Sequence, residues 1–102
     1  MSGETVRFAA PVETVIIEEG YDPAYYVTLP EEAAALVAEY RLATGKRAGF
    51  GSLRVTATIG ASTWSTTLNS RAGVWSLPIR KPVRVAEGLA KGDVIDVELE
   101  LP

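Results

Sequence analysis

The sequence predicts a mainly β fold, a small six-stranded β-barrel with one medium helix and one short helix. Apolar residues recur at every second position in six short segments, which is the period of half-buried strands. Turns containing glycine or proline separate these segments, and only two stretches have helical spacing. Many short strands with regular turns favour a closed or nearly closed barrel. We expect one domain over residues 1–102, because no linker long enough to divide the chain interrupts it.

The first strand is predicted to be long and bent near its middle. Its apolar alternation resumes at Val15 and Ile17 with the opposite parity, so one residue is inserted before Val15. A β-bulge near residues 11–14 accounts for the insertion and bends the strand, as barrel closure requires. The apolar residues of its first half are Val6, Phe8, Ala10 and Val12.

A turn at residues 20–23 leads to the second predicted strand, and Pro30 follows that strand. Proline suits the first position of a helix, where its missing N–H matters little. We therefore expect the medium helix from about Pro30 to about Arg41, while Tyr21 and Tyr26 are candidates for an exposed interface. The inward residues are Tyr25, Val27 and Leu29 in the strand, and Ala33, Leu36, Val37 and Tyr40 in the helix.

The middle of the chain has the clearest strand pattern. Gly60-Ala61 predicts a hairpin turn between the third and fourth strands, and residues 69–73 predict the turn before the fifth. Residues 44–52 form a basic, glycine-rich connection whose spacing does not match a phosphate-binding P-loop. The inward residues of these strands are Leu53, Val55, Ala57 and Ile59, then Trp64, Thr66 and Leu68, then Trp75, Leu77 and Ile79.

The C-terminal part predicts a short helix, a tight turn and the last strand. Pro82 suits the first helical position, and Gly88 suits the left-handed residue that ends a helix, so the helix spans about Pro82 to Glu87. Gly92-Asp93 forms the next turn. In the last strand, Ile95, Val97, Leu99 and Leu101 are expected to face the core, and Asp96, Glu98 and Glu100 are expected to face water.

The composition excludes several kinds of chemistry. The chain has no cysteine and no histidine, which removes disulfides, thiolates and the commonest general base and metal ligand. No carboxylate pair or hydroxyl group has a convincing catalytic neighbour, so we expect no catalytic residue, no cofactor and no metal. No apolar run approaches the roughly 20 residues that span a bilayer, and the first residues lack signal-peptide features. We expect a soluble, cytoplasmic protein that does not enter a membrane.

Charge is unevenly distributed along the chain, although the net charge is only −3. Residues 1–40 contain one basic and eight acidic residues, residues 41–91 contain nine basic and one acidic, and residues 92–102 contain four acidic and no basic. The favoured interpretation is that acidic and basic strands lie side by side and pair across the sheet. The alternatives are a basic face offered to an anionic ligand or nucleic acid, and self-association of acidic with basic faces.

Arg80, Lys81 and Arg84 form the strongest candidate ligand site in the sequence. The first two end a strand and the third lies in the first turn of the short helix, so an anion is a natural ligand. The alternative is that these bases only solvate the barrel rim or pair with Glu98 and Glu100. Two further ligand-binding candidates are Trp64, as an aromatic at a pocket mouth, and Thr66.

A set of short motifs also occurs in a characteristic order: Gly49-Phe50-Gly51-Ser52-Leu53-Arg54-Val55, Trp64-Ser65-Thr66-Thr67-Leu68, Leu77-Pro78-Ile79-Arg80-Lys81 and Gly88-Leu89-Ala90-Lys91-Gly92-Asp93. This order, over nearly the whole chain, resembles the bacterial family catalogued as domain of unknown function nineteen-oh-five. The resemblance implies a six-stranded split barrel, fused in some members to a YdeI/OmpD-associated domain, with no established activity or catalytic set. Asn69 and Ser70 stand where the family tends to have an aromatic residue and a proline.

The function expected from these observations is that of a non-enzymatic barrel that binds a small ligand or a protein, or assembles with itself. One alternative is a nucleic-acid-binding barrel, because the turn at residues 88–93 is similar to the end of AbrB-type barrels. That alternative would use the basic middle segment, and the acidic pI near 4.9 disfavours it. The other alternative is an enzyme with its site at the barrel mouth. The bases of the nucleic-acid alternative are Lys46, Arg47, Arg54, Arg71, Arg80, Lys81 and Arg84.

Overall fold

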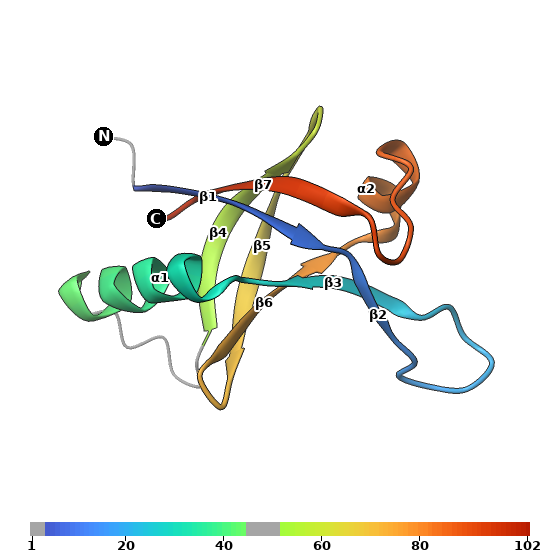
Figure 1. Cartoon of the computed structure of the whole chain (residues 1–102), viewed down its shortest axis with the longest axis horizontal. Coiled ribbons are helices and arrows are strands. Elements are labelled where there is room, and N and C mark those ends of the chain that lie inside the picture. The colour runs from blue at the N-terminus through green and yellow to red at the C-terminus, as the bar shows by residue number, and fades with distance from the viewer. Residues whose placement is uncertain (1–3, 45–51) are drawn as a thin grey trace.

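The computed structural model describes residues 4–44 and 52–102, so the glycine-rich connection expected at residues 44–52 lies almost entirely outside the described residues. The described chain forms a strongly curled sheet with two helices (Figure 1). The elements are β1 Thr5–Pro11, β2 Glu13–Val15, β3 Ala24–Thr28, α1 Glu31–Thr44, β4 Ser52–Ile59, β5 Ser62–Arg71, β6 Val74–Ile79, α2 Lys81–Ala86 and β7 Val94–Glu100.

All seven strands belong to one antiparallel sheet with the order β1-β7-β4-β5-β6-β3-β2. The two outermost strands of this order, β1 and β2, follow each other in the chain and are separated only by Val12. One long bent segment therefore pairs with β7 through its first half and with β3 through its second half. The predicted small split barrel is confirmed, and the sheet has seven strands because the predicted first strand is divided at Val12.

The bend at Val12 has a clear hydrogen-bonding cause. The Val12 N–H donates to the carbonyl of Asp93 at 2.8 Å, and the Gly92 N–H donates to the carbonyl of Val12 at 2.8 Å. The turn before β7 thus holds Val12, whose side chain is buried. After this point β2 turns towards β3, where the Thr28 hydroxyl donates to the Glu13 carboxylate at 2.8 Å.

The core lies inside the curled sheet and beneath α1, which packs against β1. Val55 and Val97, on which the predicted two-residue periodicity depends, are each 2% exposed, so that periodicity is confirmed. Burying one such aliphatic side chain stabilises the fold by about 1.5–3 kcal/mol. The largest fully buried side chains are Leu68, Leu77, Leu99, Leu101, Val12, Val27 and Val37.

The sheet opens at two splits, where neighbouring strands diverge. The β5–β6 ladder contains only three residue pairs and ends at Asn69 with Ser76. Hydrogen-bonding positions alternate along β6, and the next one after Ser76 that would face β5 is Pro78. Proline has no N–H to donate, so the ladder does not continue past this point. The β4–β7 ladder also has three pairs and ends at Thr58 with Glu98. The first half of β7, from Val94 to Val97, therefore has no partner in β4.

The short helix α2 lies next to the tip of the β4–β5 hairpin (Figure 1). Gly88 follows its C-terminal end with φ 61°, in the left-handed region that the sequence predicted. The C-cap residue of α2, Glu87, accepts a hydrogen bond from the Ser62 hydroxyl at 2.7 Å. No helix within the described residues is long and apolar enough to span a bilayer.

Several sequence expectations about individual residues were wrong. Val15 and Ile17, which the alternation assigned to a half-buried first strand, are 43% and 76% exposed, because β2 ends at Val15 and the chain leaves the sheet. Leu36 is 52% exposed, because α1 covers the sheet with a narrower stripe. The turn expected at residues 69–73 is only Ala72-Gly73, since β5 continues to Arg71 and both turn residues have positive φ.

Candidate functional site

The three predicted anion-binding bases lie around the N-terminal end of α2, and their side chains have different partners. The Lys81 ammonium is 3.4 Å from the Asp22 carboxylate in an exposed ion pair. The Arg84 guanidinium carbon lies 4.2 Å from the centre of the Tyr25 ring, a stacked cation–π contact. Within residues 4–44 and 52–102, the exposed Arg80 side chain has no charged partner. Because α2 has only six residues, its N-terminus adds little, and the anion site stays a prediction.

Trp64 and Thr66 lie apart from these bases, on the inner face of β5. They pair across the sheet with Ala57 and Val55, both of which are buried. Thr66 is 5% exposed, and Trp64 is half-buried with its indole Nε1 buried and without an acceptor in the described part of the chain. These two candidates belong to the barrel wall, and their role in ligand binding stays a prediction.

The acidic last strand does not pair with the basic middle segment through the expected residues. Glu98 accepts a 2.9 Å hydrogen bond from the Nε of Arg7, a residue of β1. This pair is exposed at both ends, and such pairs contribute at most about 1 kcal/mol. The acidic and basic segments do lie side by side, since β4 pairs with the acidic β7 and β6 pairs with β3 of the acidic first segment. One ion pair between the two kinds of segment joins Lys81 to Asp22 and is exposed.

The described bases of the middle segment also do not form one face. Arg71 ends β5 beside the β5–β6 turn, and α2 with its three bases lies at the other end of the barrel (Figure 1). Lys46 and Arg47 fall outside the described residues. A continuous basic face for nucleic acid is therefore not formed by the residues that can be placed.

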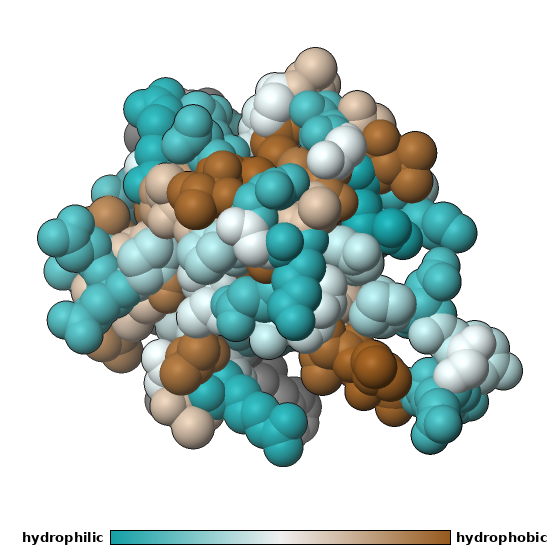
Figure 2. Space-filling view, turned by 45° about the vertical axis from the view of Figure 1, so that its right-hand side comes forward, coloured by the Kyte–Doolittle hydropathy of each residue, from teal (hydrophilic) through white to brown (hydrophobic). Residues whose placement is uncertain are grey.

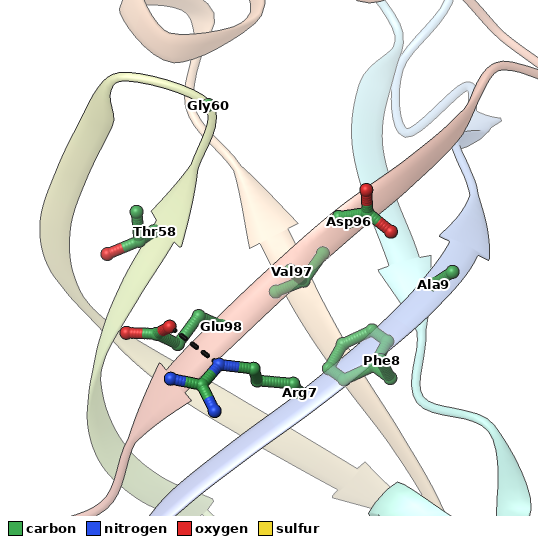
Figure 3. Close-up of a pocket in the computed structure, with 8 residues that line it drawn as sticks. All are labelled: Arg7, Phe8, Ala9, Thr58, Gly60, Asp96, Val97 and Glu98. Carbon is green, nitrogen blue, oxygen red and sulfur yellow. Dashed lines mark hydrogen bonds and ion pairs between the residues drawn. The ribbon is translucent and has the colours of Figure 1, made fainter.

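A shallow hollow of about 480 Å³ lies beside the β4–β7 split. Figure 3 shows Asp96 and Glu98 on β7, the Arg7 side chain reaching Glu98 from β1, and Phe8 further along β1. The β4 side of the hollow is formed by Thr58 and Gly60 at the hairpin tip. The hollow has an apolar part and a charged rim, and sequence periodicity could not reveal it because it depends on how β4 diverges from β7.

A hydrophobic group lies on the segment that joins β2 to β3, which we call the hairpin loop, residues 16–23. Its large side chains are strongly exposed: Ile16 by 71%, Ile17 by 76% and Tyr21 by 70%. The loop projects from the barrel on the side opposite α1 (Figure 1), and Figure 2 shows a hydrophobic patch at the lower right beside a hydrophilic tip. The exposure expected for Tyr21 is confirmed, while Tyr26 is half-buried. The sequence signal for this group is the run of three consecutive apolar residues, Val15 to Ile17, which alternation cannot bury on one face.

Comparison of the sequence with protein families identifies one matching family. The sequence profile of one family, described as "Domain of unknown function (DUF1905)", matches residues 8–99. The chain belongs to this family. The resemblance seen in the motifs is thereby confirmed, and the DUF1905 match begins within β1 and ends within β7. No curated protein matches the chain.

Proposed function

We propose that this DUF1905 domain is a non-enzymatic assembly module that binds a second copy of itself through the hairpin loop. The observation that carries the proposal is the exposure of Ile16, Ile17 and Tyr21, each at least 70% exposed, on one short segment. Exposed apolar groups that are contiguous and rimmed by polar residues are typical of protein interfaces. Removing an isoleucine side chain from water stabilises a complex by roughly 1.5–3 kcal/mol, so two of them are a substantial contribution.

The charges around the loop favour a second copy as the partner. Glu18 and Glu19 lie on the loop, and Lys81 and Arg80 lie next to it, as the contact of Lys81 with Asp22 requires. A two-fold symmetric interface uses the same patch on both chains, so that patch must be complementary to itself. A patch that combines exposed apolar side chains with both acids and bases can be complementary to itself.

The alternatives have less support. A nucleic-acid surface would need the bases to line one face, and Arg71 lies at the opposite end of the barrel from Arg80, Lys81 and Arg84. An enzyme would need converging catalytic groups, and the chain has no histidine or cysteine to supply them. The hollow beside β7 holds an ion pair of Arg7 with Glu98 and one further carboxylate, Asp96, which supports binding of a charged group better than catalysis.

The test is sedimentation equilibrium of the purified protein over a wide concentration range. We expect a mass twice the 10.9 kDa of one chain at high concentration, and a monomer for the double variant Ile16→Ser, Ile17→Ser. The matched control is Leu42→Ser on α1, because Leu42 is 84% exposed and lies on the opposite side of the barrel. The control should assemble as the wild type does.

Two results would contradict the proposal. A wild-type protein that stays monomeric at millimolar concentration has no self-interface. A dimer that survives the double serine substitution uses a different surface. If the monomeric wild type instead cosediments with phospholipid vesicles and the double variant does not, the loop is a membrane contact.

A further inference from the structure

The first half of β7 has a neighbouring strand on one side only. β1 pairs with β7 along its whole length, from Val94 to Glu100. On the other side, β4 pairs with β7 only as far as Glu98. The segment from Val94 to Val97 therefore forms an open sheet edge inside the barrel wall.

The hydrogen bonds show which backbone groups face this opening. In the β1–β7 register, the Leu101 N–H donates to the carbonyl of Glu4 and the Val12 N–H donates to the carbonyl of Asp93, each at 2.8 Å. The backbone N–H and C=O groups of residues 93 and 101 thus point towards β1. Because this orientation alternates along a strand, the backbone groups of the odd-numbered residues between them point towards β1 as well. The backbone groups of Val94 and Asp96 face the opposite side, where no strand of the described chain pairs with them.

The open edge borders the hollow and carries negative charge. The hollow is lined by Asp96, which is exposed, and by Glu98, whose side chain is 45% exposed. The base in the hollow, Arg7, already donates to Glu98, which leaves the Asp96 carboxylate without a partner among residues 4–44 and 52–102. Figure 3 shows the Asp96 side chain pointing away from the Arg7–Glu98 pair. The small Ala9 opposite Asp96 leaves room beside this carboxylate.

The other split does not offer the same surface. At the β5–β6 split, α2 follows β6 directly. The Ser62 hydroxyl, at the start of the part of β5 that does not pair with β6, donates a hydrogen bond to Glu87 at the end of α2. Covering an edge with a helix is a common way in which proteins prevent unwanted strand pairing. The β7 edge has no such helix across it in the described part of the chain, and it is flanked by the hollow.

We propose that the Val94–Val97 edge of β7 binds an extended, basic segment of a partner protein as an added strand. Backbone hydrogen bonds from Val94 and Asp96 would give the affinity, and the carboxylate of Asp96 would select lysine or arginine at the position beside it. Residues 92–102, which contain the last strand, carry four acids and no base, and Lys91 directly precedes them. The strand itself therefore has the charge that favours a basic partner. This surface is separate from the hairpin loop, so each proposal can fail without the other.

The test uses three labelled synthetic peptides and fluorescence anisotropy. The first alternates lysine with valine over seven residues, the second replaces lysine with glutamate, and the third is the lysine peptide N-methylated at alternate residues. We expect the lysine peptide to bind, and the glutamate peptide not to bind. We expect N-methylation to weaken binding at least about tenfold, because it removes backbone donors while keeping the charge.

The variants separate charge from backbone. Asp96→Asn should weaken binding of the lysine peptide about fivefold to tenfold, through loss of one charge-assisted contact. Glu100→Gln is the matched control, since it removes the same charge from the same strand where β4 already pairs, and should weaken binding less than about twofold. The Asp96 amide resonance should shift on binding of the lysine peptide, while a resonance on the hairpin loop, such as that of Gly20, should not.

The proposal is overturned if the lysine peptide does not bind at millimolar concentration and low salt. It is also overturned if the N-methylated peptide binds as well as its parent, because attraction would then be charge alone. Equal effects of Asp96→Asn and Glu100→Gln would likewise remove the assigned site. Peptide binding and the effects of Asp96→Asn and Glu100→Gln are also measured in the Ile16→Ser, Ile17→Ser variant of the hairpin loop. Binding of each peptide should be unchanged in that variant.

Discussion

The carboxylate of Glu87 accepts a 2.7 Å hydrogen bond from the hydroxyl of Ser62 and joins the end of α2 to the tip of the β4–β5 hairpin. The same carboxylate occupies the space beside Gly60, where a Cβ atom would collide with its Oε1. Gly60 also has φ 58°, which a side chain disfavours. One glycine therefore permits both the tight hairpin turn and the approach of Glu87.

Gly60→Ala should displace the Glu87 side chain and break its bond to Ser62. We expect a loss of about 1.5–3 kcal/mol in the free energy of unfolding, from left-handed strain together with one lost hydrogen bond. Urea denaturation measures it. In a Glu87→Ala background the cost of Gly60→Ala should fall to that of Gly73→Ala, since Gly73 has φ 81° and open space around it. An identical cost in both backgrounds would show that the carboxylate does not contact this site.

Gly88→Val should destabilise the protein by about 1–2 kcal/mol, because a β-branched residue fits the left-handed cap of α2 poorly. Gly88 has φ 61°, and no atom lies within 4 Å of the position that an added Cβ would occupy, so the cost is one of backbone strain alone. Gly88→Asn should cost less, because asparagine tolerates this conformation. Thermal denaturation compares the two variants, and equal costs would mean that strain is not the cause.

The strands were predictable wherever burial follows a local period. Val55, Val97 and their alternate neighbours could be placed from sequence because one face of each strand is buried and the other is not. Gly88 was predictable for a similar local reason, since a helix end needs a left-handed residue. These features depend on a few adjacent residues and not on the rest of the chain.

The surfaces that carry the proposals could not be predicted in the same way. The contact of Glu87 with Ser62 joins residues 25 positions apart, and the open edge at Asp96 depends on where β4 leaves β7. The assignment of Ile17 to the first strand is wrong because β2 ends at Val15 and the side chain of Ile17 is exposed. Periodicity says which side of a strand faces the core, but not where a strand stops pairing.

The stacking of Arg84 on Tyr25 should stabilise the junction between α2 and β3. The guanidinium carbon lies 4.2 Å from the ring centre, and Arg84 is half-buried, so we expect a coupling of about 0.5–1 kcal/mol. A double-mutant cycle with Arg84→Ala and Tyr25→Leu, followed by urea denaturation, measures this coupling. Arg84→Lys should retain part of it. A coupling of zero would show that the two side chains do not interact in solution.

Amide hydrogen exchange should alternate along the first half of β7. Ile95 and Val97 direct their N–H groups towards β1, so we expect these amides to be protected. Val94 and Asp96 direct theirs towards the open split, so their amides should exchange much faster, despite lying in the same strand. Glu98 is the internal control, because its N–H faces β4 at a paired position and should be protected. Exchange measured by NMR on the free protein decides the matter: uniform protection from Val94 to Glu98 would mean that the edge is already covered in solution.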